Sequence, residues 1–119
     1  MKPSEFQDVA SSTPVSPGIS QRLALVYRSV IPDAVVSLAA SMPEGVFFDG
    51  DFCRKMGVGE ILDAANFLHV DFQKHGIVPV FDCGDNDFIC FRLSDGQWVK
   101  FNIVDELAFR NASDWKELI

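Results

Sequence analysis

Apolar residues in the first half of the chain recur at the three- to four-residue spacing of an amphipathic helix. The first such stretch predicts a helix over residues 20–31, with Ser20 as its cap. Its apolar face comprises Ile19, Leu23, Val26 and Val30. Pro32 ends this helix, because the proline ring disfavours helical geometry in the preceding residue and lacks a backbone donor. The same spacing predicts a second helix over residues 33–42, so the pattern indicates a pair of helices joined at a proline corner.

The middle of the chain is predicted to contain short extended pieces followed by a short helix. An Asp-Gly turn signal separates extended stretches at residues 46–48 and 52–56. Apolar residues then recur with helical spacing over residues 59–67, which predicts a helix. The pattern in residues 68–75 assigns no element.

The last third of the chain alternates between apolar strand patterns and polar turns. Residues 77–82, 88–93 and 98–104 are rich in β-branched and aromatic residues, so they predict an antiparallel meander. Pro79 places the first of these strands at a sheet edge or at a bulge, because proline cannot donate to the ladder. A short helix is predicted over residues 113–118. Helices on either side of an antiparallel sheet predict an α+β fold.

The expected domain organisation is one compact core. A chain of 119 residues has the size of a single domain. Residues 1–18 are rich in proline and small polar residues without periodicity, so they are predicted to be a flexible leader, partly disordered or draped over the domain. Residues 19–119 are predicted to form the domain, and the eleven phenylalanines of the chain favour a core of aromatic rings around a sheet.

The chain is acidic, with a formal net charge of −7 that is spread along its length. This charge argues against nucleic acid as a partner, since a phosphate backbone requires clustered lysine and arginine. A basic protein is the better partner, because opposite charges accelerate encounter and reject wrong partners; the alternative is that the charge serves solubility alone. The sequence shows no secretion signal and no uncharged apolar run long enough to span a membrane, so a cytoplasmic protein without a membrane partner is predicted.

Three cysteines, Cys53, Cys83 and Cys90, form an odd set without a Cys-x-x-Cys spacing. They are predicted to be reduced residues of a cytosolic protein. The two histidines, His69 and His75, lie six residues apart rather than the four of a helical metal site. Neither is therefore expected to be a ligand or a base, and no metal or other cofactor is expected.

Three aspartates and an asparagine crowd into residues 82–88, which read Asp-Cys-Gly-Asp-Asn-Asp-Phe. A calcium site would use the alternate carboxylates of Asp85 and Asp87, but an EF-hand loop is longer and ends in a glutamate. A catalytic pair of carboxylates is a second interpretation. No nucleophile, metalloprotease or phosphate-loop motif accompanies it, so no enzyme is expected. A polar turn between two strands is the third interpretation, and Asp, Gly and Asn favour it most strongly.

The order of these motifs resembles the SUKH superfamily, many of whose members are immunity proteins of bacterial polymorphic toxin systems. The matching segments are Val78-Pro79-Val80, the loop at residues 82–87, the strand at 88–93, the hairpin at Asp95-Gly96 and the final helix at 112–118. Upstream, residues 30–45 resemble the helix corner of that superfamily, and residues 59–67 resemble its short helix.

The resemblance implies a small α+β domain that binds another protein and does no chemistry itself. Its expected role is that of a cytoplasmic immunity protein, which binds and neutralises a cognate toxin that has a basic surface. The alternative is a regulatory or scaffold module of the same superfamily. The candidate partner-binding residues are Asp82, Asp85, Asn86, Asp87, Trp98, Asp49 and Asp51. The identity of the toxin and the oligomeric state stay open.

Overall fold

The computed structural model of the chain describes residues 1–119 and contains a five-stranded antiparallel sheet. The strands are β1 (Arg54–Lys55), β2 (Ile77–Asp82), β3 (Asp87–Arg92), β4 (Trp98–Asn102) and β5 (Leu107–Ala112). They follow one another across the sheet in chain order, and each pairs antiparallel with the next. This arrangement extends the predicted meander and confirms the α+β fold.

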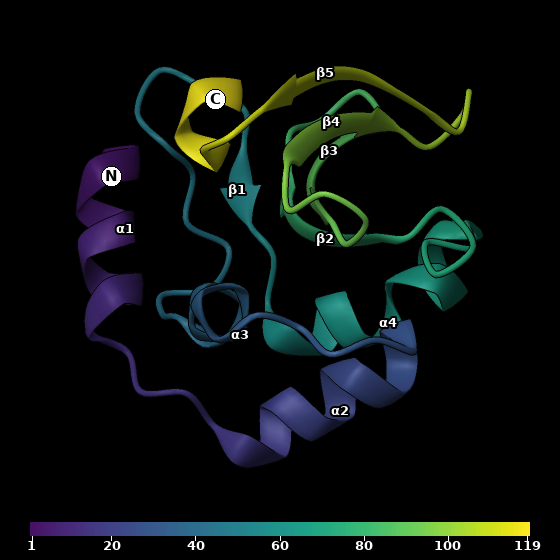
Figure 1. Cartoon of the computed structure of the whole chain (residues 1–119). Helices are drawn as coiled ribbons and strands as arrows, with labels where there is room; N and C mark the ends of the chain where they lie inside the picture. The colour runs from purple at the N-terminus through teal and green to yellow at the C-terminus, as the bar shows by residue number, and fades with distance from the viewer.

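Four α-helices and one 3-10 turn accompany the sheet. They are α1 (Pro3–Ser12), α2 (Pro17–Tyr27), α3 (Asp33–Ala40), α4 (Val58–Leu68) and the 3-10 turn η1 (Trp115–Leu118). Figure 1 shows the helices along the left and lower sides of the molecule, while the strands curve around its upper right. The η1 turn packs against β4 and β5. None of the helices combines the length and the apolarity that crossing a membrane requires.

The first helix contradicts the prediction of a flexible leader over residues 1–18. Pro3 begins α1, and the fully buried Phe6 and Ala10 fix it to the core. The ring of Phe6 lies edge-on to the rings of Phe48 and Trp115, with centroids 5.9 and 6.4 Å away. Two apolar residues four apart are too few to give a periodic signal in the sequence, although they suffice to bury one face of a short helix.

The helix that the sequence predicts over residues 20–31 is α2, which begins and ends earlier, at Pro17 and Tyr27. Ser16, rather than Ser20, caps α2 by accepting a hydrogen bond from the Ile19 amide, and the helix ends where Arg28 adopts a left-handed conformation. Its buried face comprises Leu23 and Tyr27, so the assignment of Val26 and Val30 to that face is wrong. The Tyr27 hydroxyl donates a buried hydrogen bond to a carbonyl of α4 and thereby connects the two helices.

The sheet has one strand more than the predicted three-stranded meander at its C-terminal end. The third predicted strand ends at Asn102, and β5 follows after a turn. Five of the six residues of β5 are exposed, so the strand lacks the alternation by which half-buried strands are recognised. The register between β2 and β3 shifts between Pro79 and Phe81, which confirms the bulge, but β2 lies inside the sheet rather than at its edge.

One charged residue lies inside the core between the sheet and the helices. Lys55 of β1 is fully buried, and its amine donates hydrogen bonds to the carbonyls of Ala39, near the end of α3, and Met56. A cation near the C-terminal end of a helix is favourable because the last carbonyls there lack partners within the helix. Burial nevertheless disfavours the charge and lowers the pKa of Lys55 to about 8, although Glu44 and Glu60 act in the opposite direction.

Candidate protein-binding site

Two turns that are far apart in the sequence lie side by side at one end of the sheet. The first turn, residues 48–53, precedes β1, and the second, residues 83–86, connects β2 to β3. The pairing of β1 with β2 places Arg54 opposite Asp82, so the turns continue from two neighbouring strand ends. Two groups of predicted site residues, Asp49 with Asp51 and residues 82–87, are therefore brought to one place.

A disulfide between Cys53 and Cys83 joins the two turns. Cys53 directly precedes Arg54 and Cys83 directly follows Asp82, so the antiparallel pairing of Arg54 with Asp82 brings the two cysteines opposite each other. The prediction that all three cysteines are reduced is therefore wrong for two of them, while Cys90 is free and buried. No spacing signal in the sequence indicates this bond, because the two cysteines lie 30 residues apart and meet only through the pairing of β1 with β2.

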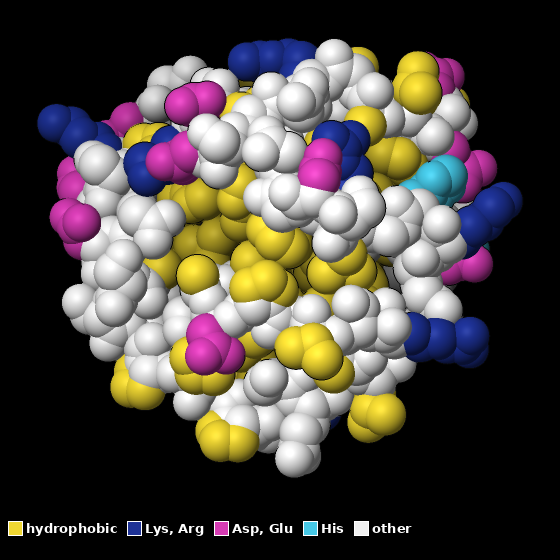
Figure 2. Space-filling model, viewed as in Figure 1, with side chains coloured by type: hydrophobic (Ala, Val, Ile, Leu, Met, Phe, Trp, Pro, Cys, Tyr) yellow, Lys and Arg dark blue, Asp and Glu magenta, His cyan; other side chains and the backbone are white.

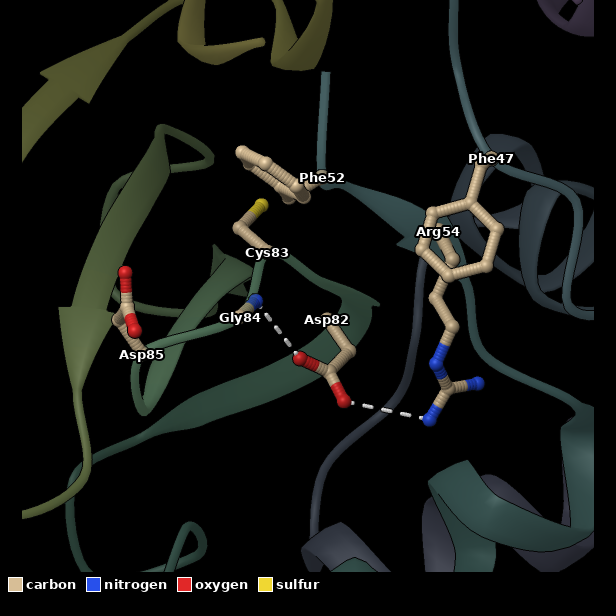
Figure 3. A pocket seen from close by; sticks show the side chains of 7 residues that line it. All are labelled: Phe47, Phe52, Arg54, Asp82, Cys83, Gly84 and Asp85. Atoms are coloured by element: carbon tan, nitrogen blue, oxygen red, sulfur yellow. Dashed lines mark hydrogen bonds and ion pairs between the residues drawn. The ribbon is translucent and has the colours of Figure 1, made fainter.

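A pocket of about 380 Å³ lies between the two turns, and this two-turn pocket is shown in Figure 3. Cys83 lines it together with six other residues, Phe47, Phe52, Arg54, Asp82, Gly84 and Asp85. Figure 3 shows the side chain of Phe52 beside Cys83, with Phe47 and Arg54 on one side of the pocket and Asp85 on the other. The pocket thus combines aromatic rings with charged groups.

The two phenylalanines of the pocket are exposed to an unusual degree for such large apolar side chains. The exposed fraction is 81% for Phe52 and 55% for Phe47. Both flank the Asp49-Gly50 turn, and both were missed as site residues in the sequence. The available signal was an aromatic residue on each side of a short turn, where a side chain has few neighbours that could bury it.

Arg54 organises the charged side of the pocket. Its guanidinium donates two hydrogen bonds to the Glu60 carboxylate, at 3.1 and 2.9 Å, and a third to Oδ2 of Asp82 at 3.2 Å. The hydrogen bonds from Arg54 lower the pKa of Glu60 below its usual value. Glu60 also accepts from the Gly57 amide at the start of α4, so this network connects the pocket to a helix.

The second turn is held in one conformation by its own backbone. The Cys83 amide donates to the Asp87 carbonyl at 2.8 Å, and Oδ1 of Asp82 accepts from the Gly84 amide at 3.0 Å. Asp85 and Asn86 both have positive φ angles, of 51° and 66°, which few residue types other than glycine tolerate as well as Asp and Asn. The interpretation of residues 82–88 as a turn between strands is confirmed.

The predicted acidic site residues differ in their exposure and in the hydrogen bonds that their side chains already form. Asp49, Asp85 and Asn86 are exposed, while Asp51, Asp82 and Asp87 are partly buried. Asp82 is bonded to Arg54 and Gly84, Asp87 accepts from Asn102 at 2.9 Å, and Asp51 accepts from the Cys53 amide at 2.9 Å. Asp85 forms no hydrogen bond or ion pair through its carboxylate, so it is the free acid beside the pocket.

Trp98 is not a surface contact residue, contrary to the prediction. Only 7% of its surface is exposed. Its ring packs on those of Phe91 and Phe81, with centroids 5.3 and 6.4 Å away. Strand alternation placed Trp98 on the same face as the partly exposed Lys100 and Asn102, but nearby aromatic side chains cover that face at its end of the strand.

A second hollow, about 340 Å³ in volume, lies between α3, the sheet and η1. Its apolar lining includes Val35 and Leu38 from α3, Phe91 and Trp98 from the sheet, and Trp115 from η1. Figure 2 shows apolar side chains gathered in a hollow in the middle of this face of the molecule. The rings of Phe91, Trp98 and Trp115 are buried in the core, so this groove offers little of their surface to a partner.

No group of three or more His, Cys, Asp or Glu side chains in the structure is arranged to hold a metal ion. Comparisons with models of known protein families and with curated proteins found no match for this chain.

Proposed function

We propose that this protein neutralises a bacterial toxin by binding a basic surface of the toxin through the two-turn pocket. The observation that supports the proposal is the pair of exposed rings, Phe47 and Phe52, set among aspartates. Aromatic side chains that become buried contribute much of the binding energy at many protein interfaces. Exposed carboxylates around them steer an oppositely charged partner into place.

A toxin is proposed as the partner because of the resemblance to the SUKH superfamily. A protein that neutralises a toxin must bind it tightly, and a rigid surface loses little conformational entropy on binding. The paired strands and the backbone hydrogen bonds of the second turn supply that rigidity. A regulatory module of the same superfamily could use the same surface, and its partner would then be a basic protein that is not toxic.

Co-expression with the product of the neighbouring gene tests the proposal. That product, expressed alone in a bacterial host, should stop growth, and expression of this protein with it should restore growth. The purified pair should also form a complex in isothermal titration calorimetry. Growth arrest that persists with both proteins soluble, or rescue without direct binding, would contradict the proposal.

A matched pair of variants tests whether the two-turn pocket is the surface involved. We expect Phe52→Ala to weaken toxin binding by about 2 kcal/mol, which is a typical cost of truncating an aromatic anchor. Phe67, an exposed phenylalanine on α4 that does not line the pocket, serves as the control through Phe67→Ala. Equal affinities of the two variants for the toxin would show that the contact surface lies elsewhere.

A cytoplasmic location is part of the proposal, and the disulfide makes it testable. Cytosolic reductants keep most thiols reduced, so cytosolic protein quenched with acid at lysis should carry Cys53, Cys83 and Cys90 as thiols. The Cys53–Cys83 bond should then form when the purified protein is exposed to air. Mass spectrometry after alkylation counts the free thiols, and a bond already present at the quench would contradict a cytoplasmic location.

A further inference from the structure

The two-turn pocket has an excess of negative charge that its own groups leave uncompensated. Two carboxylates, those of Asp82 and Asp85, line the pocket together with one cation, Arg54. Arg54 is already shared between Glu60 and Asp82. The carboxylate of Asp85 has no partner, and Asp85 lies in a tight turn of three consecutive residues with positive φ, Gly84 to Asn86. An incoming group that completes the pocket should therefore be a cation.

The two phenylalanines of the pocket favour a cation that can stack on an aromatic ring. Phe47 pairs with Arg54 across an isolated antiparallel bridge, and Phe52 lies beside Gly84 of the other turn. Both rings expose much of their surface to the pocket side of the molecule. The face of an aromatic ring attracts a cation, and the attraction grows when the cation gives up its water easily.

We infer that the two-turn pocket binds an arginine side chain of a partner protein, an inference that rests on the proposed function. A guanidinium group is planar, weakly hydrated and able to stack on an aromatic ring while it donates two hydrogen bonds to one carboxylate. Asp85 is the acceptor, and Phe47 and Phe52 are the apolar walls. The volume of about 380 Å³ suits one long side chain rather than a folded segment.

Lysine is the competing side chain, and its chemistry fits the pocket less well. Its ammonium group is a compact charge that holds water strongly and cannot form the two parallel hydrogen bonds of a guanidinium. An ammonium beside Asp85 would gain the ion pair without the stacking on Phe47 or Phe52. Discrimination between the two cations therefore separates the pocket from a general acidic surface, which would bind both equally.

An NMR titration of the ¹⁵N-labelled full-length chain tests the inference with two blocked tripeptides, Gly-Arg-Gly and Gly-Lys-Gly, at low salt. The arginine peptide should shift the amide signals of Phe52, Cys53, Gly84 and Asp85 in a saturable way. Its dissociation constant should be about fivefold lower than that of the lysine peptide, in line with the stronger stacking and paired hydrogen bonds of arginine.

Two variants and two control variants test which residues bind the arginine peptide. Asp85→Asn removes the charge while keeping a residue that tolerates positive φ, and Phe52→Ala removes one wall; each should weaken the arginine peptide about fivefold or more. Asp105→Asn and Phe67→Ala change an exposed acid and an exposed ring outside the pocket, and each should leave the affinity unchanged. Circular dichroism checks that every variant is folded.

The results that overturn the inference are equal affinities for the two peptides, signals that do not saturate, or an affinity unaffected by Asp85→Asn. Shifts confined to the groove between α3 and η1 would overturn it as well. Failure of this inference is distinguishable from failure of the proposed function. A neutralised toxin together with negative peptide titrations leaves the proposed function standing, whereas arginine binding without toxin binding leaves only the arginine pocket.

Discussion

Lys55 is the residue whose environment departs furthest from what its type prefers. Its amine lies in the core, where two backbone carbonyls accept its hydrogen bonds. A neutral amine retains two N–H donors, so both bonds can persist after the proton is lost. The lowered pKa means that the folded state binds this proton less tightly than the unfolded chain does, and stability therefore rises with pH between the two pKa values.

We expect the stability of the wild-type protein to rise relative to Lys55→Met as the pH increases from about 8 towards 10.5. The shift from 10.5 to about 8 corresponds to a difference of about 3 kcal/mol at most between neutral and strongly alkaline pH. Burial raises the pKa values of Tyr27 and Cys90 in the folded state, and both residues are present in the two proteins, so the comparison cancels their contributions. Urea unfolding at pH 7, 9 and 10 measures the difference, and parallel curves for the two proteins would contradict the assignment.

The aromatic residues show what the sequence can and cannot predict at the scale of a residue. The eleven phenylalanines correctly predicted an aromatic core, in which Phe6, Phe48 and Phe81 meet Trp115. The sequence could not say which aromatic residues stay outside that core. Phe47 and Phe48 are neighbours in the chain, yet one is exposed and the other buried, because the chain pairs with β1 at Phe47 and, as in a strand, successive side chains point to opposite sides.

At the scale of the elements, patterns of apolar spacing predicted α3, α4 and the three strands β2 to β4 nearly to their ends. They failed for α1 and β5, and for opposite reasons. α1 is a helix that buries only two side chains, and β5 is a strand that buries almost none. Both depend on contacts with distant parts of the chain, which no local window of sequence contains.

The packing of α1 on the core gives a prediction about its buried and its exposed side. Phe6→Ala should lower the free energy of unfolding by about 3–5 kcal/mol, because it leaves a cavity among three other rings. Val9→Ala, on the exposed side of the same helix, should change it by less than about 0.5 kcal/mol. Chemical denaturation measures both, and a small effect of Phe6→Ala would restore the hypothesis of a flexible leader.

The second turn of the pocket gives a prediction that depends on the backbone alone. Asn86 has a φ of 66°, which alanine adopts with strain and glycine without it. Asn86→Ala should therefore destabilise the protein by about 1 kcal/mol, and Asn86→Gly should be close to neutral. Thermal unfolding of the two variants distinguishes them, and equal melting temperatures would show that the turn relaxes to another conformation.

At the scale of the whole molecule, the chain brings separate acidic segments to one end of the sheet. The sequence identified Asp49, Asp51 and the aspartates of residues 82–88 as candidate contact residues, but it did not place them on one surface. Their union follows from the pairing of β1 with β2, and β1 contains only two residues. A strand of two residues is too short to show an apolar pattern of its own. The sequence therefore could not predict that β1 pairs with β2 and brings the two turns together.

The net charge of −7 and the acidic turns together determine how fast a basic partner should associate. Asp85→Asn removes one exposed charge without breaking an internal bond, whereas changing Asp82 would also remove a hydrogen bond of Arg54. We expect Asp85→Asn to slow association with a basic toxin at low salt, and the difference from wild type to shrink as ionic strength approaches about 0.5 M, where screening acts over a few ångströms. Stopped-flow association rates across a salt series measure this, with Asp105→Asn as the control.

Long-range steering depends on the total charge, so both variants should show a small loss of association rate. Only the removal of a charge within the interface should also raise the dissociation rate. An unchanged dissociation rate in Asp85→Asn would place the contact surface away from the two-turn pocket.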